Sequence, residues 1–297
     1  ELGDRVKRLT TVLRDGGVSK GDRVGYIGLN HPTFLELLYA CGCLGAVFVP
    51  LNFRLTGPEV RFIANDADIT LMFADDMLRP LIDSEKATLN CTRYLTIESA
   101  ADGWDSLESL MAEAKPADGS EKVEADDIAF IMYTSGTTGL PKGAMLTHGN
   151  VFWNSINVCF GEDTMTTTTL TCAPLFHIGG LNVTTLLSLA KGIEVVLLRS
   201  FDAGEVLSLI EEHKVGSMFG APTMFLMMAQ HENFASTDLS SVTALICGGA
   251  PVPVPLIKTY GERGVSFCQG YGLTETAPFA SLLSSDLTML KVGSAGK

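Results

Sequence analysis

Tyr133-Thr-Ser-Gly-Thr-Thr-Gly-Leu-Pro-Lys-Gly143 is the most informative stretch of this sequence, and it follows directly on the apolar run Ile128 to Tyr133. A short apolar run of this kind predicts a buried strand. The glycines that follow permit positive φ and close backbone approach, so successive N–H groups can turn toward an anion. The hydroxyl groups add donors, and Lys142 adds a mobile positive charge. The stretch therefore predicts a strand that opens into a polyphosphate-binding loop.

This loop differs from the common nucleotide P-loop, in which Gly-Lys is followed by Ser or Thr. Here Pro141 precedes Lys142, and Gly143 follows it. The alternative is a polar connecting loop without a ligand, but ordinary loops mix Asn, Asp and Pro more freely. We therefore interpret the stretch as a phosphate loop of another kind.

Composition indicates a folded protein with a large core. The 297 residues are 46% hydrophobic and 19% charged, and this length suggests about two domains. The net charge is −13, and no run of Lys and Arg is present, which argues against nucleic acid or an anionic membrane surface as a partner. Seven cysteines, an odd number without Cys-x-x-Cys spacing, indicate a reducing compartment, and the cytoplasm is expected.

Helix and strand patterns alternate along the chain, which predicts an α/β fold of two layered, mostly parallel sheets flanked by helices. The predicted helices cover residues 2–13, 32–44, 56–65, 150–159, 180–189, 222–230 and 253–263, with a further helix opened by Asp202 and Glu205. The predicted strands cover residues 23–29, 46–51, 69–73, 128–133, 169–173, 194–198, 217–219, 244–247 and 265–269.

Two subdomains are expected. The first covers residues 1–160 and carries the phosphate loop, although residues 1–17 could instead pack on the second, which covers residues 161–297. The acidic stretch 115–127 is expected to be an exposed linker. The uncharged run 37–53 is interrupted by Gly and Pro and predicts a buried helix and strand, so no transmembrane segment is expected.

Three later segments place polar or small residues where predicted strands end, and open α/β sheets bind ligands at that edge. Ala173-Pro-Leu-Phe-His-Ile-Gly-Gly180 contains His177, and Cys247-Gly-Gly-Ala-Pro251 contains only small residues. Gln269-Gly-Tyr-Gly-Leu-Thr-Glu-Thr276 combines an aromatic face, a hydroxyl and a carboxylate. A carboxylate beside a polyphosphate is well placed to bind Mg²⁺. Taken singly, these segments could also be a structural histidine, a strand-to-helix turn and an exposed turn.

Together the four segments resemble, in order and separation, the core motifs of the adenylate-forming superfamily, which includes acyl- and aryl-CoA synthetases, and the resemblance covers nearly the whole chain. It implies the following contacts with the β- and γ-phosphates of ATP: Thr134, Ser135, Gly136, Thr137, Thr138, Gly139 and Lys142. It implies that the nucleotide is bordered by Gly248, Gly249, Ala250, Pro251, Gly270, Tyr271 and Gly272.

The same resemblance implies the catalytic groups. Thr274 would contact the α-phosphate, Glu275 would bind Mg²⁺, and His177 would lie where the acyl carboxylate meets that phosphate. The reaction implied is attack of a carboxylate on the α-phosphorus of ATP, with release of pyrophosphate, followed by transfer of the acyl group to coenzyme A. Lys142 would assist by neutralising charge, because such chemistry depends mainly on alignment and electrostatics.

Within the superfamily, the chain looks most like a fatty-acyl-CoA synthetase acting on medium or long chains. Members that activate amino acids carry an aspartate where His177 stands, which disfavours an amino acid, whereas an aryl-CoA ligase remains an alternative. The methionine-rich run 223–228 could line an acyl tunnel or belong to the core. Family members continue past Lys297 into a lid domain, so we expect a large amino-terminal domain, with an ATP- and acyl-binding fragment of little activity as the rival hypothesis. A homodimer is left open.

Overall fold

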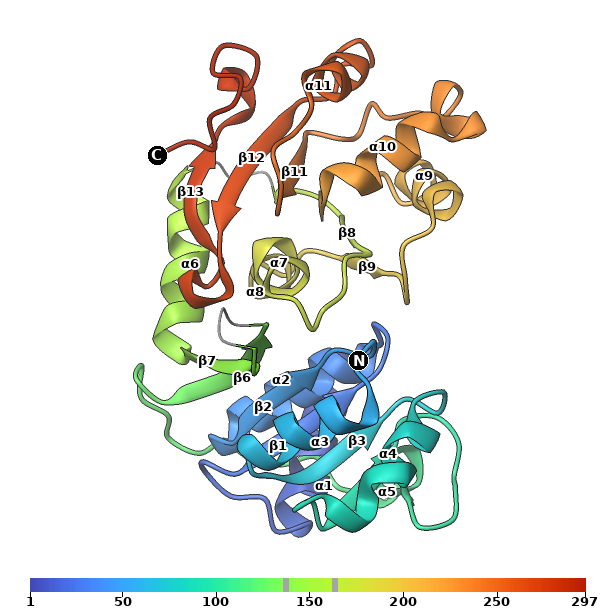
Figure 1. The fold of residues 1–297 in the computed structure, drawn as a ribbon, viewed down its shortest axis with the longest axis vertical. Helices are drawn as coiled ribbons and strands as arrows, with labels where there is room; N and C mark the ends of the chain where they lie inside the picture. The colour runs from blue at the N-terminus through green and yellow to red at the C-terminus, as the bar shows by residue number, and fades with distance from the viewer. Residues whose placement is uncertain (136–138, 162–164) are drawn as a thin grey trace. The chain divides into compact units, whose positions relative to one another are not determined.

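The structure is a computed structural model that describes residues 1–135, 139–161 and 165–297. It divides into two compact units, Glu1–Gly149 and Asn150–Lys297, whose elements are labelled in Figure 1. Each unit is built around its own β-sheet. The predicted α/β class is therefore confirmed, and the two units are described in turn.

The first unit contains, among its described residues, a seven-stranded sheet in the order β5-β4-β3-β1-β2-β6-β7. Neighbouring strands are parallel except β6 and β7, which pair antiparallel. The strands are β1 (Arg23–Ile27), β2 (Val47–Leu51), β3 (Ile69–Ala74), β4 (Arg93–Thr96), β5 (Asp105–Ser106), β6 (Ile128–Thr134) and β7 (Lys142–Thr147).

Helices cover both faces of this sheet. They are α1 (Leu2–Asp15), α2 (Pro32–Leu44), α3 (Gly57–Asp66), α4 (Arg79–Glu85), the 3₁₀ turn η1 (Lys86–Thr88) and α5 (Leu107–Glu113). Phe34 of α2 packs edge-on against Tyr26 and Phe48, whereas α3 packs on Ile27 and Val49. Because successive strand residues face opposite sides, α2 and α3 lie on opposite faces. No helix in the described part of the chain is long and apolar enough to cross a membrane.

The second unit contains, in the part that the structure describes, a six-stranded sheet in the order β13-β12-β11-β10-β8-β9. Only the edge pair β12 and β13 is antiparallel. The strands are β8 (Thr169–Thr171), β9 (Val195–Leu197), β10 (Ser217–Gly220), β11 (Ala244–Gly248), β12 (Phe267–Gly272) and β13 (Phe279–Leu283).

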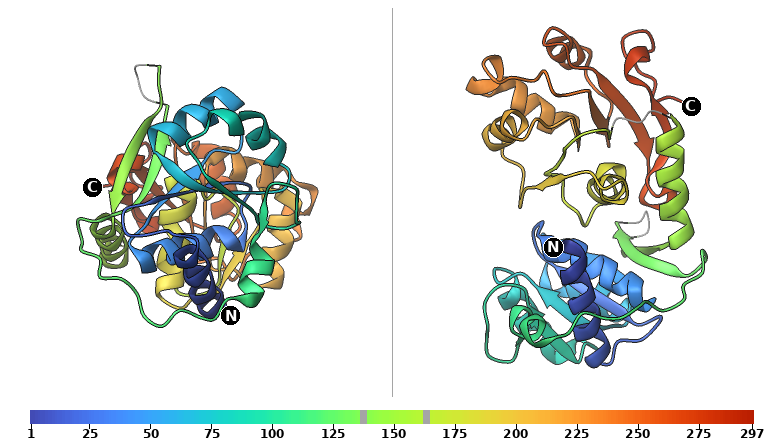
Figure 2. Two further views of the ribbon diagram at one scale, coloured as in Figure 1. Left: turned by 90° about the horizontal axis from the view of Figure 1, so that it is seen from below. Right: turned by 180° about the vertical axis from the view of Figure 1, so that it is seen from behind.

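Two groups of helices cover this second sheet. One face carries α9 (Ala203–Glu212), α10 (Pro222–Gln230) and α11 (Val254–Gly261). The other carries α6 (His148–Gly161), α7 (Ile178–Gly180), the π-helix η2 (Leu181–Thr185) and α8 (Leu186–Ala190). Both Figure 1 and the rear view in Figure 2 show α6 running beside β13. Short 3₁₀ turns complete the unit: η3 (Glu232–Ala235), η4 (Thr274–Thr276) and η5 (Ser285–Leu287).

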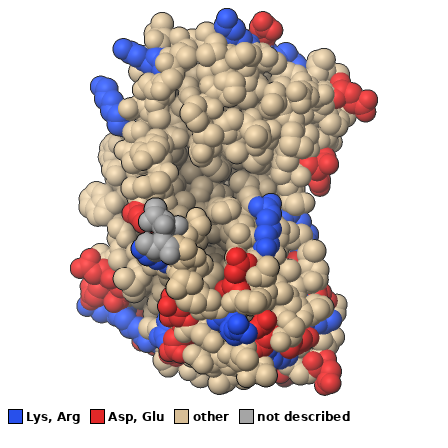
Figure 3. Space-filling view, in the orientation of Figure 1, with Lys and Arg blue, Asp and Glu red and all other residues tan. Residues whose placement is uncertain are grey.

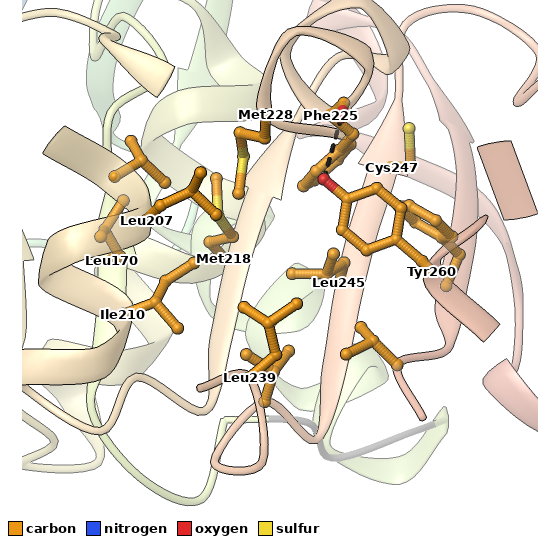
Figure 4. Packing of buried hydrophobic residues seen from close by; sticks show 14 of the residues in the cluster. Leu170, Leu207, Ile210, Met218, Phe225, Met228, Leu239, Leu245, Cys247 and Tyr260 are labelled. Carbon is orange, nitrogen blue, oxygen red and sulfur yellow. Dashed lines mark hydrogen bonds between the residues drawn. The ribbon is translucent and has the colours of Figure 1, made fainter. Parts of the chain in front are cut away.

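The larger core of the second unit lies between its sheet and α9 to α11, as Figure 4 shows. Phe225 and Met228 of α10 are completely buried there, so these two residues of the methionine-rich run are core, whereas Leu226 and Met227 are exposed. The hydroxyl of Tyr260 donates to the carbonyl of Phe225 at 2.9 Å. Burial raises the pKa of the Cys247 thiol to about 12, so Cys247 acts as a small apolar group.

On the face shown in Figure 3, acidic and basic residues are interspersed over the first unit, and fewer charges cover this face of the second.

Most predicted elements are confirmed with shifted ends, but the strands β4, β5, β7 and β13 and the helices α4 and α5 were not predicted. Of the missed strands, β7 and β13 are each added antiparallel at the edge of their sheet. Thr56 and Glu59 cap the start of α3, because Glu59 accepts hydrogen bonds from the Thr56 N–H and hydroxyl at 2.8 and 2.7 Å. Asp202 likewise accepts from the Glu205 N–H at 2.9 Å.

The boundary between the units differs from the expected one. The units divide between Gly149 and Asn150, whereas residue 160 was expected to end the first. The reason is α6, because its residue Val158 packs with Ile246 and Cys268 of the second sheet. The prediction left open whether residues 1–17 pack on the second subdomain. They belong to the first unit, where α1 packs on α2 and α5.

An ion-pair network fixes α1 in the first unit. Arg5 donates to Glu36 of α2 at 2.6 Å and to Glu108 of α5 at 2.5 Å. The Glu36 side chain is only 2% exposed, whereas that of Glu108 is 48% exposed. Hydrogen bonds to Glu108 and Glu36 raise the pKa of Arg5. One guanidinium therefore joins three helices.

We predict that Glu36→Ala lowers the free energy of unfolding by about 2–3 kcal/mol, because it breaks a buried pair while Arg5 keeps Glu108. Glu108→Ala removes the exposed partner of the same guanidinium and is the control, with an expected loss of about 0.5–1 kcal/mol. Urea denaturation of the two variants measures both values. Equal losses of unfolding free energy in the two variants would contradict the view that the buried Arg5–Glu36 pair contributes more than the exposed Arg5–Glu108 pair.

Candidate active site

Two antiparallel strands, β6 and β7, flank the segment that was predicted to bind phosphate. Thr134, the last residue of β6, pairs with Lys142, the first residue of β7. Ser135 and Lys142 are exposed, and the side chain of Lys142 forms no ion pair with any residue that the structure describes. Gly139 has a φ of +95° and open space where a side chain would lie. Gly136, Thr137 and Thr138 were predicted to bind phosphate, and they lie outside the described residues.

Tyr133 anchors the base of this hairpin. Its hydroxyl donates to Asp66, at the end of α3, at 2.6 Å, and its ring faces Gly143 so closely that a Cβ there would meet ring carbons at 3.2 Å. Burial and the bond to Asp66 raise the pKa of Tyr133. The phenol therefore stays neutral and holds the strands that carry Thr134 and Lys142.

His177 lies at the carboxyl end of β8. The chain turns sharply there, because the His177 N–H donates to the carbonyl of Pro174 at 3.1 Å, and a Cβ on Gly180 would come within 2.3 Å of that carbonyl oxygen. The imidazole is exposed, whereas the ring of Phe176 beside it is buried, with ring centres 4.2 Å apart. The turn thus presents the imidazole at the sheet edge.

Behind His177 the chain forms the π-helix η2, which the sequence analysis did not foresee. Thr185 donates to the carbonyl of Gly180 at 2.8 Å and lies 2.8 Å from the hydroxyl of Thr171. Both threonines are buried. Single π turns are frequent at functional sites, and this one holds Gly180, the second of the two glycines that follow His177.

The small residues after β11 lie at the same sheet edge as His177. Gly248 ends β11, and Gly249, with a φ of +84°, has open space where a side chain would lie. Ala250 and Pro251 are exposed. Phe219 links this turn to the histidine segment, because its ring would meet a Cβ on Gly179 at 2.7 Å and one on Gly248 at 3.2 Å. The small residues therefore allow a flat ring to approach the backbone.

The segment from Gln269 to Thr276 begins as β12 and ends in the turn η4. Gly270 is paired in register with Gly248, while Tyr271 and Glu275 are exposed and Thr274 is partly exposed. Gly272 is required by packing, because a Cβ there would lie 1.8 Å from the Pro278 carbonyl oxygen. Thr276 accepts a hydrogen bond from the Leu273 N–H at 2.8 Å. This turn therefore holds Thr274 and Glu275 at the surface.

Three of the four predicted segments are thus brought to one edge of the second sheet, where β8, β11 and β12 end. The fourth segment, which lies between β6 and β7, belongs to the first unit. A nucleotide fits this edge on two observations. The turn at Gly249 offers open backbone, and the buried Nε2 of Gln269 has no partner among the described residues. A buried donor of this kind is expected to have a partner. The sequence analysis did not select Gln269, although its place at the head of the motif could have identified it.

Glu275 is the predicted metal ligand. Among the described residues, no cluster of three or more His, Cys, Asp or Glu could hold a metal ion. Mg²⁺, however, usually binds through one or two carboxylates together with substrate phosphates. The exposed carboxylate of Glu275 is therefore compatible with this chemistry, and its role as a metal ligand stays a prediction.

Comparison with known proteins identifies the family. Residues 1–297 match the family described as AMP-binding enzyme. The chain belongs to this family. The chain is 45% identical over 297 residues to a protein named feruloyl-CoA synthase from Amycolatopsis sp. This match covers 100% of this chain and 58% of that protein. It is 36% identical over 302 residues to the long-chain-fatty-acid–CoA ligase FadD13 of Mycobacterium tuberculosis. This match covers 100% of this chain and 58% of FadD13.

A solved structure agrees with this membership. The inhibitor-bound N-terminal domain of FACL13 from Mycobacterium tuberculosis superimposes with a TM-score of 0.93 at 34% sequence identity, covering 100% of this chain and 74% of that one. The predicted fold and the stated resemblance to adenylate-forming enzymes are therefore confirmed. The chain spans about 58% of the length of these two curated relatives.

We predict that Gly272→Ala destabilises the second unit by about 2–3 kcal/mol, because a methyl group cannot be placed against the Pro278 carbonyl without displacing the backbone. The same variant should bind ATP less tightly, since the turn carrying Thr274 and Glu275 would move. Gly261→Ala in α11 is the matched control, because nothing lies within 4 Å of its Cβ position. It should be neutral or stabilising by about 0.5–1 kcal/mol. Denaturation and ATP titration measure both effects, and similar values for the two variants would refute the packing constraint.

Proposed function

We propose that the protein to which this chain belongs is an AMP-forming acid–thiol ligase that converts a carboxylic acid, ATP and coenzyme A into an acyl-CoA. One observation carries the proposal. The segments of His177, Gly249 and Glu275 reach a single sheet edge in a chain that matches the AMP-binding family over its whole length. The names of the relatives, which include CoA ligases and a CoA synthase, support the same reaction.

In the proposed reaction, a carboxylate oxygen attacks the α-phosphorus of ATP and pyrophosphate leaves with the bonding electron pair, giving an acyl-adenylate. The thiolate of coenzyme A then attacks the acyl carbon, and AMP leaves. The small residues Gly248 to Pro251 and the exposed face of Tyr271 border the nucleotide. Thr274 donates its hydroxyl to the α-phosphate, and His177 lies beside the reacting carboxylate.

The negative charge of the polyphosphate is balanced from two places. Lys142 and the donors at the hairpin, Thr134, Ser135 and Gly139, contact the outer phosphates. Glu275 binds Mg²⁺, which supplies charge neutralisation at the phosphate oxygens when bound. The protein therefore contributes alignment and electrostatics rather than a covalent nucleophile.

The acid is either a fatty acid or an aromatic acid. The sequence-based preference is a medium- or long-chain fatty acid, and FadD13 is a relative of that kind by its name. The higher identity to a feruloyl-CoA synthase favours an aromatic acid as the second candidate. The presence of His177 where amino-acid-activating members carry aspartate disfavours an amino acid.

An acid panel tests the proposal. The full-length protein is given ATP, Mg²⁺ and coenzyme A with fatty acids of increasing length, hydroxycinnamic acids, and phenylalanine as the amino-acid control. We expect pyrophosphate release and an acyl-CoA, detected by mass spectrometry, with at least one fatty or aromatic acid and none with phenylalanine. Absence of pyrophosphate release with every acid would overturn the function. The isolated 297-residue chain, tested in parallel, decides whether it turns over or only binds ATP.

We predict that Lys142→Ala weakens ATP binding about tenfold, since a charge-assisted hydrogen bond to a phosphate contributes roughly 1.5–3 kcal/mol, while AMP binding changes less than about twofold. The difference arises because Lys142 faces phosphates that AMP lacks. Calorimetric titration with each nucleotide measures it. Lys7→Ala, an exposed lysine on α1, is the charge-matched control and should leave both affinities unchanged. Equal losses for ATP and AMP would refute the placement of Lys142.

A further inference from the structure

Ala277 ends the turn that carries Thr274 and Glu275, and its backbone is left-handed. Its φ is +65° and its ψ is 32°. This conformation is uncommon for residues other than glycine, and such strain of about 1–3 kcal/mol persists only where the surroundings determine it. Ala277 is 5% exposed, so its immediate neighbours must hold this geometry.

Two buried asparagines make the hydrogen bonds on the far side of Ala277. The side-chain Nδ2 of Asn182 donates to the Ala277 carbonyl at 3.2 Å. Two residues along the chain, the N–H of Phe279 donates to the Oδ1 of Asn154 at 3.5 Å. The backbone on both sides of Pro278 is therefore bonded to side chains of other elements.

The two asparagines are also joined to each other. Nδ2 of Asn154 donates to the backbone carbonyl of Asn182 at 3.2 Å, and their exposures are 7% and 2%. Asn154 belongs to α6, and Asn182 belongs to the π-helix that follows His177. Buried amides of this kind are costly unless bonded, and these bonds are directed at the end of the Thr274–Glu275 turn.

Packing leaves the turn little freedom on its other side. Gly272 leaves no room for a side chain against the Pro278 carbonyl, and the Leu273 N–H donates to that carbonyl at 3.1 Å. The two ends of the turn, Leu273 and Pro278, are therefore bonded to each other. Asn182 and Asn154 connect the end of this turn to η2 and α6, through the Ala277 carbonyl and the Phe279 N–H.

We propose that Asn154 and Asn182 are positioning residues, which hold the Thr274–Glu275 turn in the geometry needed to meet the α-phosphate and its Mg²⁺. The inference rests on the function proposed above. Asn182 links the turn to the segment of His177, so that the groups assigned to the phosphate and to the carboxylate are fixed by one buried side chain. Neither asparagine touches a reactant in this proposal.

Asn182→Ala tests it, with Asn154→Ala as a second variant. Ser188→Ala is the matched control, because Ser188 is fully buried in α8 and its hydroxyl lies 2.8 Å from the hydroxyl of Thr169, away from residues 271–280 in the sequence. Glu275→Ala removes the carboxylate itself and sets the largest loss expected. Two measurements are made on the full-length protein: amide hydrogen exchange of residues 271–280 without ligand, and the Mg²⁺-dependent increase in ATP affinity.

In both asparagine variants we expect the amides of Ala277 and Phe279 to exchange about tenfold faster. We also expect the Mg²⁺-dependent increase in ATP affinity to fall toward that of Glu275→Ala. Ser188→Ala should change neither quantity. Unchanged amide exchange in both asparagine variants would overturn the claim that Asn154 and Asn182 stabilise the backbone of this turn. Faster exchange with full Mg²⁺ dependence would overturn the positioning role and leave a structural one. If the unaltered protein binds no ATP, the proposed function fails, and the positioning role with it, whatever the exchange shows.

Discussion

Parallel hydrogen bonding among β8, β10, β11 and β12 is the constraint on which the rest of the second unit depends. Parallel strands deliver their carboxyl ends to one edge, and each connection must return through a helix across a face. His177, Gly249 and Glu275 are far apart in the sequence and reach one edge for this reason. Small residues at the strand ends then let Phe219 pack against Gly179 and Gly248.

The candidate chemistry follows from this geometry because the proposed reaction needs alignment and charge rather than a protein nucleophile. The cysteines at the sheet are packing groups, as the raised pKa of Cys247 indicates. The groups that reach the surface are the imidazole of His177, the hydroxyl of Thr274 and the carboxylate of Glu275, which lie on turns, and the phenol of Tyr271, which lies near the end of β12. Rigid turns of this kind suit a site that must hold a polyphosphate and an acid in line.

Much of the fold could be predicted from the sequence, and two of the missed strands, β7 and β13, were missed for the same reason. The helix over residues 32–44 and the helix over 222–230 were predicted with the observed ends, because periodicity and proline mark them locally. β7 contains Gly143 and Ala144, which are weak strand formers, and it exists because β6 pairs with it. β13 likewise depends on its pairing with β12. Pairing partners are distant information that a local pattern does not contain.

The sequence by itself determined the α/β class, the family resemblance and the residue types at the candidate site, because motif order and hydrophobic period are written along the chain. Only the tertiary structure decided that α6 packs with the second unit, that Tyr133 bonds Asp66, and that Asn154 and Asn182 hold the backbone around Ala277. The sequence around an asparagine in an apolar helix does not indicate which group its side chain bonds. Its role depends on which carbonyl the fold brings within hydrogen-bond distance, and that is a property of packing.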